Sequence, residues 1–142
     1  MYEYSAEVIR VIDGDTVEVR FDLYFKTVRK EGEIMYEYSA EVIRVIDGDT
    51  LEVRLDLGFK IQHTTTLRLA GLNAPEMRTD EGHAAKAWLT AELSGKKIFV
   101  ETIKDKKEKY GRYLAKIDAQ DDSGMWYSVN ERMIAEGQAV RM

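Results

Sequence analysis

The sequence has no cysteine and only one proline, and it contains no long apolar run. The absence of cysteine excludes disulfide bridges and thiolate metal sites. No apolar run approaches the roughly 20 residues that a membrane-spanning helix needs. The start of the chain also lacks the basic and apolar regions of a signal peptide, so we expect a cytoplasmic protein.

The chain also lacks an excess of basic residues. It has 21 Lys and Arg against 26 Asp and Glu, which gives a net charge of −5 and a pI of about 5.2. Proteins that grip nucleic acid over a large surface are usually basic. The acidic net charge therefore argues against tight non-specific binding of nucleic acid. It leaves room only for a local basic site. The 142 residues are enough for one hydrophobic core.

A tandem repeat occupies the first part of the sequence. Residues 1–26 (copy 1) recur at residues 35–60 (copy 2). The copies differ at only three positions: Val17/Leu51, Phe21/Leu55 and Tyr24/Gly58. Such near-identity indicates a recent event, which we interpret as an engineered duplication, with natural tandem duplication as the alternative. Two copies are too few for a solenoid.

Each copy is expected to form two strands joined by a tight turn. In copy 2, apolar and polar residues alternate over 38–45, which is typical of a half-buried strand. Asp47, Gly48 and Asp49 have the composition of a turn. Apolar side chains at every second position from 51 to 61 then predict a second strand with one buried face.

The rest of the sequence predicts a mainly β, α+β barrel. The predicted elements are strands at 64–70, 97–103, 113–118 and 125–127 and helices at 81–93 and 131–136. A charged loop is expected at 104–112. Strands come first and helices are few, which favours a barrel over a parallel sheet. We divide the chain into a duplicated hairpin segment, 1–34, and one domain, 35–142.

Four polar groups follow these strands in an order that suits phosphodiester chemistry. They are the Asp47–Asp49 turn, Arg68, the loop with Asn73 and Glu76, and the sequence Tyr110-Gly111-Arg112. Carboxylate and carbonyl oxygens bind calcium, arginine forks match phosphate oxygens, and a positioned carboxylate can activate water. Each group alone is ordinary turn or surface chemistry. Their occurrence together predicts a site for a phosphodiester.

These segments resemble the staphylococcal nuclease (thermonuclease) family. The resemblance rests on VIDGDT at 45–50, LRLAGLNAPE at 67–76, KYGR at 109–112 and VNE at 129–131. It implies a five-stranded OB-type barrel with two helices, to which copy 1 adds an extra N-terminal β-hairpin. It also implies calcium-dependent hydrolysis of DNA and RNA, with single-stranded nucleic acid as the substrate.

The resemblance assigns roles to eight residues of this chain. The implied calcium ligands are Asp49, Asn73 and the backbone carbonyl of Ala74. The implied catalytic residues are Arg68 and Arg112, which clamp the phosphate, and Glu76, the general base. The implied substrate contacts are Lys109 and Tyr110, which meet the phosphate and sugar of the nucleotide.

Two departures from the family pattern predict a weakened enzyme. Asn73 stands where the family has a second aspartate, so the site has one negative charge fewer and we expect weaker calcium binding. The sequence ends at Met142, shortly after Gly137, where the family continues into tyrosines and a further helix. We therefore expect weaker stacking on bases.

Two alternatives to the enzyme remain open. A non-catalytic OB-fold that binds nucleic acid or a protein would agree with Asn73 and with the acidic pI. An engineered duplication for the study of folding or dimerisation would agree with the near-identical copies, and it could coexist with activity.

The repeat raises the question of which copy fills the barrel. Copy 2 is joined directly to the third strand, so closing the barrel with copy 2 costs less chain entropy. We therefore expect Asp49, rather than Asp15, to be the metal ligand. The spare hairpin is not stable alone. It should pack on the barrel or form a homodimer, through the hairpin itself or by strand swapping.

Overall fold

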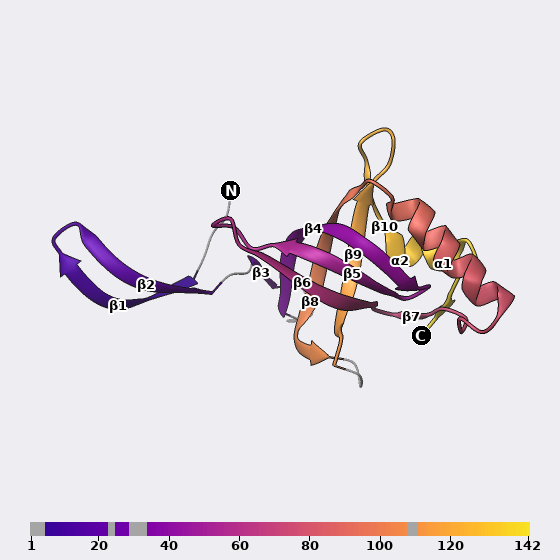
Figure 1. The fold of residues 1–142 in the computed structure, drawn as a ribbon, viewed down its shortest axis with the longest axis horizontal. Coiled ribbons are helices and arrows are strands. Elements are labelled where there is room, and N and C mark those ends of the chain that lie inside the picture. The colour runs from indigo at the N-terminus through magenta and orange to yellow at the C-terminus, as the bar shows by residue number, and fades with distance from the viewer. Residues whose placement is uncertain (1–4, 23–24, 29–33, 108–110) are drawn as a thin grey trace.

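The structure is a computed structural model that describes residues 5–22, 25–28, 34–107 and 111–142 (Figure 1). Its centre is a closed barrel of five strands: β4 (Ile34–Asp47), β5 (Thr50–Asp56), β6 (Gln62–Leu69), β8 (Lys97–Lys107) and β9 (Tyr113–Gln120). Pairing runs from β4 through β5, β6, β9 and β8 back to β4. β6 and β9 pair in parallel and the other pairs are antiparallel. The predicted OB-type barrel is confirmed.

Two helices and several short strands complete the fold. The helices are α1 (Asp80–Leu93) and α2 (Val129–Ala135). Both lie at the end of the barrel away from the N-terminal hairpin (Figure 1). The short strands are β3 (Phe25–Val28), β7 (Leu72–Asn73), β10 (Trp126–Ser128) and β11 (Val140–Arg141). In the described part of the chain, no helix has the length and apolar character needed to cross a membrane.

The hydrophobic core lies inside the barrel and under α1. Fully buried side chains come from both, among them Leu51, Val53, Leu67, Leu69, Leu89, Leu93, Ile98 and Val100. Burying one such side chain stabilises the fold by about 1.5–3 kcal/mol. Helix α1 begins where the Thr79 side chain accepts the backbone N–H of Gly82 at 3.0 Å, a typical N-cap. The core thus holds α1 and the loop before it against the barrel.

The two copies fold into the same hairpin. Copy 1 forms β1 (Ser5–Asp13) and β2 (Thr16–Asp22). Val8 pairs with Val19 as Val42 pairs with Val53, and both hairpins have register irregularities at the same two points. The local sequence is therefore enough to specify the register and the bulges of the hairpin.

The copies differ in what covers them. β4 and β5 form part of the barrel wall, whereas β1 and β2 project from it as a separate two-stranded sheet (Figure 1). Leu51 is 0% exposed in the barrel, whereas its counterpart Val17 is 53% exposed. At the base of the projecting hairpin, the Phe21 and Phe59 rings lie 4.8 Å apart. The prediction that copy 2 fills the barrel is confirmed.

The three positions at which the copies differ explain why copy 2 fits better. The valine of copy 1 would leave space at Leu51, and its phenylalanine would overfill the position of Leu55, which is 6% exposed. Each mismatch in a packed core costs about 1–3 kcal/mol. Gly58 has a φ of 74°, a conformation that the tyrosine of copy 1 would avoid. That tyrosine, Tyr24, lies outside the described residues.

Two predicted boundaries are wrong. β5 ends at Asp56, and Phe59 and Ile61 are 55% and 43% exposed rather than buried. The cause is a tight turn, in which the Ile61 N–H donates to the Gly58 carbonyl at 2.8 Å. β8 extends to Lys107 and takes in part of the predicted charged loop. Pairing of β8 with β4 and β9 satisfies its backbone groups, which the charged local sequence does not reveal.

Candidate active site

The turn between β4 and β5 positions the first candidate ligand. The Asp47 carboxylate accepts the backbone N–H of Asp49 at 3.0 Å, which stabilises the turn. A Cβ atom on Gly48 would lie 2.7 Å from the Cβ of Ala74 and 2.9 Å from the Cβ of Ala85. A glycine therefore lets the turn approach α1 and the loop that carries the other predicted ligands.

The equivalent turn of copy 1 has the same local structure but different surroundings. The Asp15 N–H donates to the Asp13 carboxylate at 3.1 Å. A Cβ atom on Gly14 would meet nothing within 4 Å. The structure thus places Asp49 beside the other predicted site residues and Asp15 at the far end of the projecting hairpin.

Asp49 lies in a largely buried contact with Arg68. Its Oδ2 atom accepts the Ala74 N–H at 2.9 Å and lies 3.3 Å from Nη2 of Arg68, with the two side chains 15% and 12% exposed. Burial raises the pKa of Asp49, and its hydrogen bond with Asp47 raises it further. The Ala74 N–H and the Arg68 charge lower the pKa but do not cancel the effect of burial.

Arg68 is held by the loop that follows its own strand. Its Nη1 atom donates to the carbonyls of Leu69 at 2.8 Å and Leu72 at 3.0 Å. Its Nη2 atom donates to Oδ1 of Asn73 at 2.7 Å. The guanidinium therefore bridges the end of β6, strand β7 and Asp49. Such a fixed fork is suited to recognising an anion.

Arg112 reaches the same region from the start of β9. Its Nη1 atom donates to Oγ1 of Thr50 at 2.8 Å, and the Thr50 hydroxyl donates to Oδ1 of Asp49 at 3.2 Å. Thr50 is 2% exposed. The two predicted phosphate-binding arginines are thus anchored to neighbouring residues at the start of β5.

Glu76 lies on the adjacent loop but faces solvent. Its carboxylate forms an ion pair with Arg78 at 2.5 Å, with the two side chains 68% and 82% exposed. Its backbone is fixed, because its carbonyl accepts the Thr79 hydroxyl at 2.6 Å. A Cβ atom on Gly82 would lie 2.0 Å from the same carbonyl oxygen. The backbone of Glu76 is therefore held in place, whereas its carboxylate remains exposed.

The oxygen atoms near Arg68 are of the types that calcium prefers. The Asp49 carboxylate and the Asn73 amide oxygen both contact one cationic nitrogen, Nη2 of Arg68. Oxygens of these types suit calcium, and Asp49 and Asn73, with the Ala74 carbonyl, could hold it. Among the described residues, no cluster of three or more histidine, cysteine, aspartate or glutamate side chains forms a metal site.

Two of the predicted site residues lie outside the part of the chain that the structure describes. One residue of the group around Asp49 and Arg68 was not predicted. Lys109 and Tyr110 are outside the described residues. Thr50, which joins Arg112 to Asp49, was not predicted as a site residue. Its position directly after the Asp-Gly-Asp turn was the available signal. The hydroxyl of a threonine there can reach the aspartate that precedes it.

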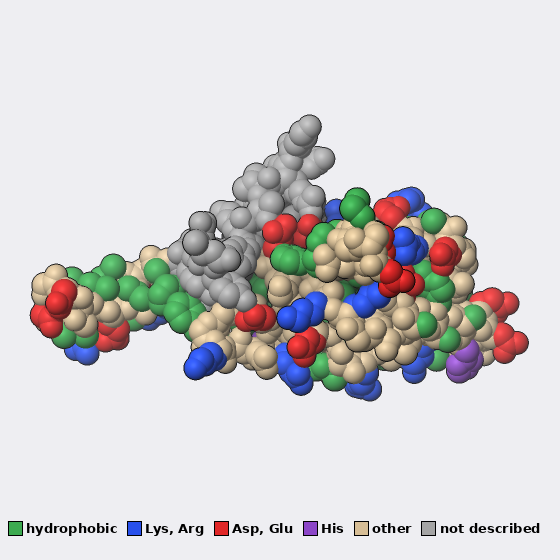
Figure 2. Space-filling view, turned by 90° about the horizontal axis from the view of Figure 1, so that it is seen from above, with side chains coloured by type: hydrophobic (Ala, Val, Ile, Leu, Met, Phe, Trp, Pro, Cys, Tyr) green, Lys and Arg blue, Asp and Glu red, His purple; other side chains and the backbone are tan. Residues whose placement is uncertain are grey.

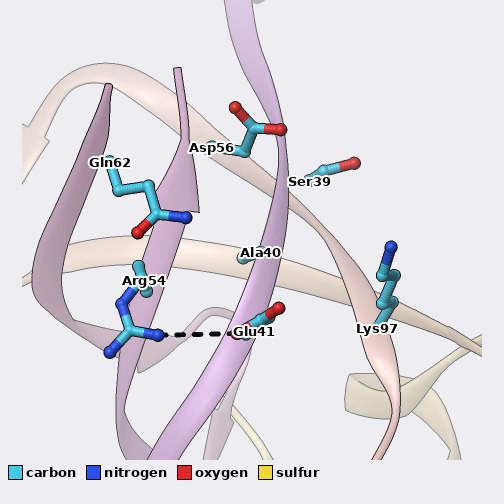
Figure 3. Close-up of a pocket in the computed structure, with 7 residues that line it drawn as sticks. All are labelled: Ser39, Ala40, Glu41, Arg54, Asp56, Gln62 and Lys97. Atoms are coloured by element: carbon cyan, nitrogen blue, oxygen red, sulfur yellow. Dashed lines mark ion pairs between the residues drawn. The ribbon is translucent and has the colours of Figure 1, made fainter. Parts of the chain in front are cut away.

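A separate hollow of about 230 Å³ lies on the barrel surface (Figure 3). Its lining residues are Ser39, Ala40, Glu41, Arg54, Asp56, Gln62 and Lys97. Arg54 pairs with Glu41 at 3.5 Å. Copy 1 has the same pair between Arg20 and Glu7 at 3.8 Å. The same arginine and glutamate are paired in both hairpins. We therefore interpret them as an ion pair on the solvated outer face of the hairpin.

The barrel with its two helices defines an OB-type protein whose charged cluster lies at the start of β5. Residues 66–142, more than half of the chain, match the family model described as staphylococcal nuclease homologue. The chain belongs to this family. The match begins after both copies of the repeat and so does not include Asp49. The position of Asp49 beside Ala74 and Arg68 comes from the structure alone. A comparison with curated proteins gave no match.

Proposed function

We propose that the chain is a calcium-dependent nuclease that hydrolyses phosphodiester bonds of single-stranded DNA and RNA. The observation that carries the proposal is the anchoring of Arg68 on Asp49 and of Arg112 on Thr50. Two guanidiniums held on neighbouring residues can contact one phosphate from two directions. Membership of the nuclease family supports the same chemistry.

The arginines would bind and stabilise the reacting phosphate. Negative charge grows on the phosphate oxygens as a nucleophile attacks, and pre-positioned guanidiniums stabilise it. Arg68 already has hydrogen-bond acceptors on two sides, at Leu69 and Asn73. The carbonyls of Leu69 and Leu72 are not proposed calcium ligands, so they would still hold Nη1 when calcium displaces Nη2 from Asn73. Arg112 would contribute from β9, with Thr50 as its anchor.

Asp49, Asn73 and the Ala74 carbonyl would hold the calcium ion. When bound, the ion would supply positive charge that neutralises the phosphate and lowers the pKa of a water molecule. In this structure the side-chain oxygens of Asp49 and Asn73 contact Arg68. Asp49 provides one full negative charge and Asn73 provides none, so we infer weaker binding than a site with two carboxylates would have.

Glu76 is the proposed general base. Its exposed ion pair with Arg78 is of a kind that contributes about 0–1 kcal/mol, so the carboxylate can leave it at little cost. A hollow of about 280 Å³ lies beside Asn73 and Ala74, between the β7 loop and the β11 segment. We infer that nucleic acid occupies this hollow, and that Lys109 and Tyr110 contact its phosphate and sugar.

The test is digestion of denatured DNA with calcium and then with a chelator. Cleavage should require calcium and fall at least about 100-fold in Glu76→Gln, the loss expected when a general base is removed. Asn73→Asp, which restores a second carboxylate, should lower the calcium concentration needed. Cleavage that survives both the chelator and Glu76→Gln would contradict the proposal.

A second candidate is a nucleic-acid-binding module that does not cut. The contact between Arg68 and Asn73 favours it, because it satisfies the amide oxygen without a metal. The two candidates differ in one measurement. If the wild-type chain binds labelled single-stranded DNA but leaves it intact at high calcium, and Asn73→Asp does not restore cleavage, the binding module is the correct function.

A further inference from the structure

The projecting hairpin of copy 1 is amphipathic. Three cross-strand pairs place apolar side chains on one face: Ala6/Phe21, Val8/Val19 and Val11/Val17. Their counterparts in copy 2 are buried in the barrel or packed against its core. In copy 1 this face, which we call the hairpin face, lies outside the barrel (Figure 1), and Phe21 at its base contacts Phe59.

The charged side chains of the hairpin lie on its other face. Arg10 pairs with Glu18 at 2.8 Å, and Arg20 pairs with Glu7 at 3.8 Å. Arg10 and Glu18 face each other across the strands, at a position that alternates with the Val8/Val19 and Val11/Val17 pairs. The ion pairs can therefore stay in water when the hairpin face is covered.

The hairpin face exposes several neighbouring apolar side chains to solvent. Val8, Val11 and Val17 are 58%, 68% and 53% exposed. In the space-filling view, apolar side chains run along the projecting hairpin, with acidic side chains at its far end (Figure 2). Contiguous exposed apolar surface of this kind marks an interaction site or an aggregation hazard, and a hairpin that stands alone is marginal in water.

We propose that the hairpin face binds the hairpin face of a second copy of this chain. The barrel wall of a second copy does not cover it, because the better-fitting copy 2 already occupies the position of this hairpin there. If two chains exchanged hairpins, each barrel would still take up one hairpin. One of the two hairpins of each chain would therefore stay uncovered. Each second chain, however, brings the same uncovered apolar face. Pairing the two faces about a two-fold axis covers both.

Charge complementarity sets the direction of the pairing. Asp13 and Asp15 flank the turn at the tip of the hairpin. Lys60 lies near its base, next to Phe59, which contacts Phe21. An antiparallel pair places the acidic tip of one chain near Lys60 of the other and keeps the two tips apart. A parallel pair would bring the acidic tips together.

The size of the face predicts a weak dimer. Strands of seven residues, rising about 3.3 Å per residue and about 4.8 Å apart, give a face of roughly 23 by 10 Å. A standard stable interface covers about 800 Å² on each partner, and this face is smaller. The dimer should therefore dissociate on dilution. The inference concerns residues outside the candidate active site and does not depend on the proposed function.

The first experiment measures mass by sedimentation velocity over roughly a hundredfold range of concentration, with a matched pair of variants. Val8→Asp introduces a charge into the hairpin face. Ile9→Asp makes the same change in the next residue, whose counterpart Ile43 is 39% exposed on the assembled barrel. Wild type and Ile9→Asp should shift from monomer to dimer as concentration rises, and Val8→Asp should remain monomeric. Thermal unfolding should show that both variants retain the barrel.

The second experiment uses the absence of cysteine from the sequence. Under mild oxidation, Val19→Cys should form a covalent dimer, because Val19 is in the middle pair of the hairpin face and so lies nearest the two-fold axis of an antiparallel pair. Ile9→Cys should form much less. A wild-type chain that is monomeric throughout the concentration range would overturn the proposal. So would a dimer that Val8→Asp leaves unchanged. Association that arises only after unfolding and refolding would mean hairpin exchange between barrels, and would also overturn it.

Discussion

Nη2 of Arg68 lies 2.7 Å from Oδ1 of Asn73 and 3.3 Å from Oδ2 of Asp49. One guanidinium nitrogen therefore contacts both side-chain oxygens that we propose as calcium ligands. Calcium and this nitrogen carry the same sign of charge and compete for the same acceptors. Binding of the ion should therefore be coupled to movement of Arg68 away from the oxygens and toward a phosphate.

Arg68→Gln should bind calcium several-fold more tightly than the wild type. The substitution removes the competing positive charge and leaves Asp49 and Asn73 in place. Titration calorimetry with calcium alone, without nucleic acid, measures this affinity. Cleavage by the same variant should fall about 100-fold or more, because a group that stabilises the transition state is lost. Weaker calcium binding in Arg68→Gln would show that the arginine supports the metal site instead of competing with it.

Asp49→Asn should abolish cleavage, whereas Asp15→Asn should leave it unchanged. The two aspartates occupy identical sequence positions in the repeat, but Asp49 contacts Ala74 and Arg68 and Asp15 lies at the exposed tip of the hairpin. Initial rates on denatured DNA at saturating calcium provide the measurement. A loss in Asp15→Asn with Asp49→Asn active would mean that copy 1 supplies the site.

Gly48→Ala should destabilise the protein by about 1–3 kcal/mol, the usual cost of overpacking. The added methyl group would lie 2.7 Å from the Cβ of Ala74 and would push the turn away from the candidate ligands. Gly14→Ala is the matched control, since a Cβ there meets nothing within 4 Å. Its stability should stay within about 0.5 kcal/mol of the wild type. Urea unfolding of both variants measures the difference, and equal effects would contradict the close packing of Gly48.

Ionisation of Asp49 should reduce the stability of the metal-free protein as the pH rises. Burial raises the pKa of Asp49 in the folded state. The protonated form is therefore favoured by folding at acidic pH, and that contribution is lost as the pH rises through the raised pKa. In chelator, Asp49→Asn should be more stable than the wild type at neutral pH, with a difference that shrinks toward acidic pH. Asp15→Asn removes the same charge from an exposed turn and is the control. If the stability difference between Asp49→Asn and the wild type grew toward acidic pH, the pKa of Asp49 would not be raised in the folded state.

Much of the fold could be predicted because its signals are local. Alternating apolar residues specify the barrel strands, and the Asp47–Asp49 turn joins two of them. The end of β5 was misjudged because alternation continues through Phe59 and Ile61, while the turn at Gly58 reverses the chain. The pairing of β7 with β11 was not predicted, since two-residue strands leave no periodic pattern.

The candidate site was predictable in its residue types but not in its contacts. The motifs pointed to Arg68, Asn73 and Glu76, yet spacing alone does not reveal that Arg68 donates to Asn73. The same is true of Glu76, whose carboxylate pairs with Arg78 on its own loop. Both contacts depend on how the loop after β6 folds in three dimensions.

The two identical stretches provide a measurement of tertiary stabilisation within a single molecule. Amide hydrogens in Ser5–Asp13 and in the matching part of β4 have the same neighbours in sequence and the same strand register. Their intrinsic exchange chemistry is therefore equal, and the ratio of their exchange rates reports the difference in local opening free energy. Each pair of equivalent amides thus gives, residue by residue, the protection that closure of the barrel adds to a hairpin.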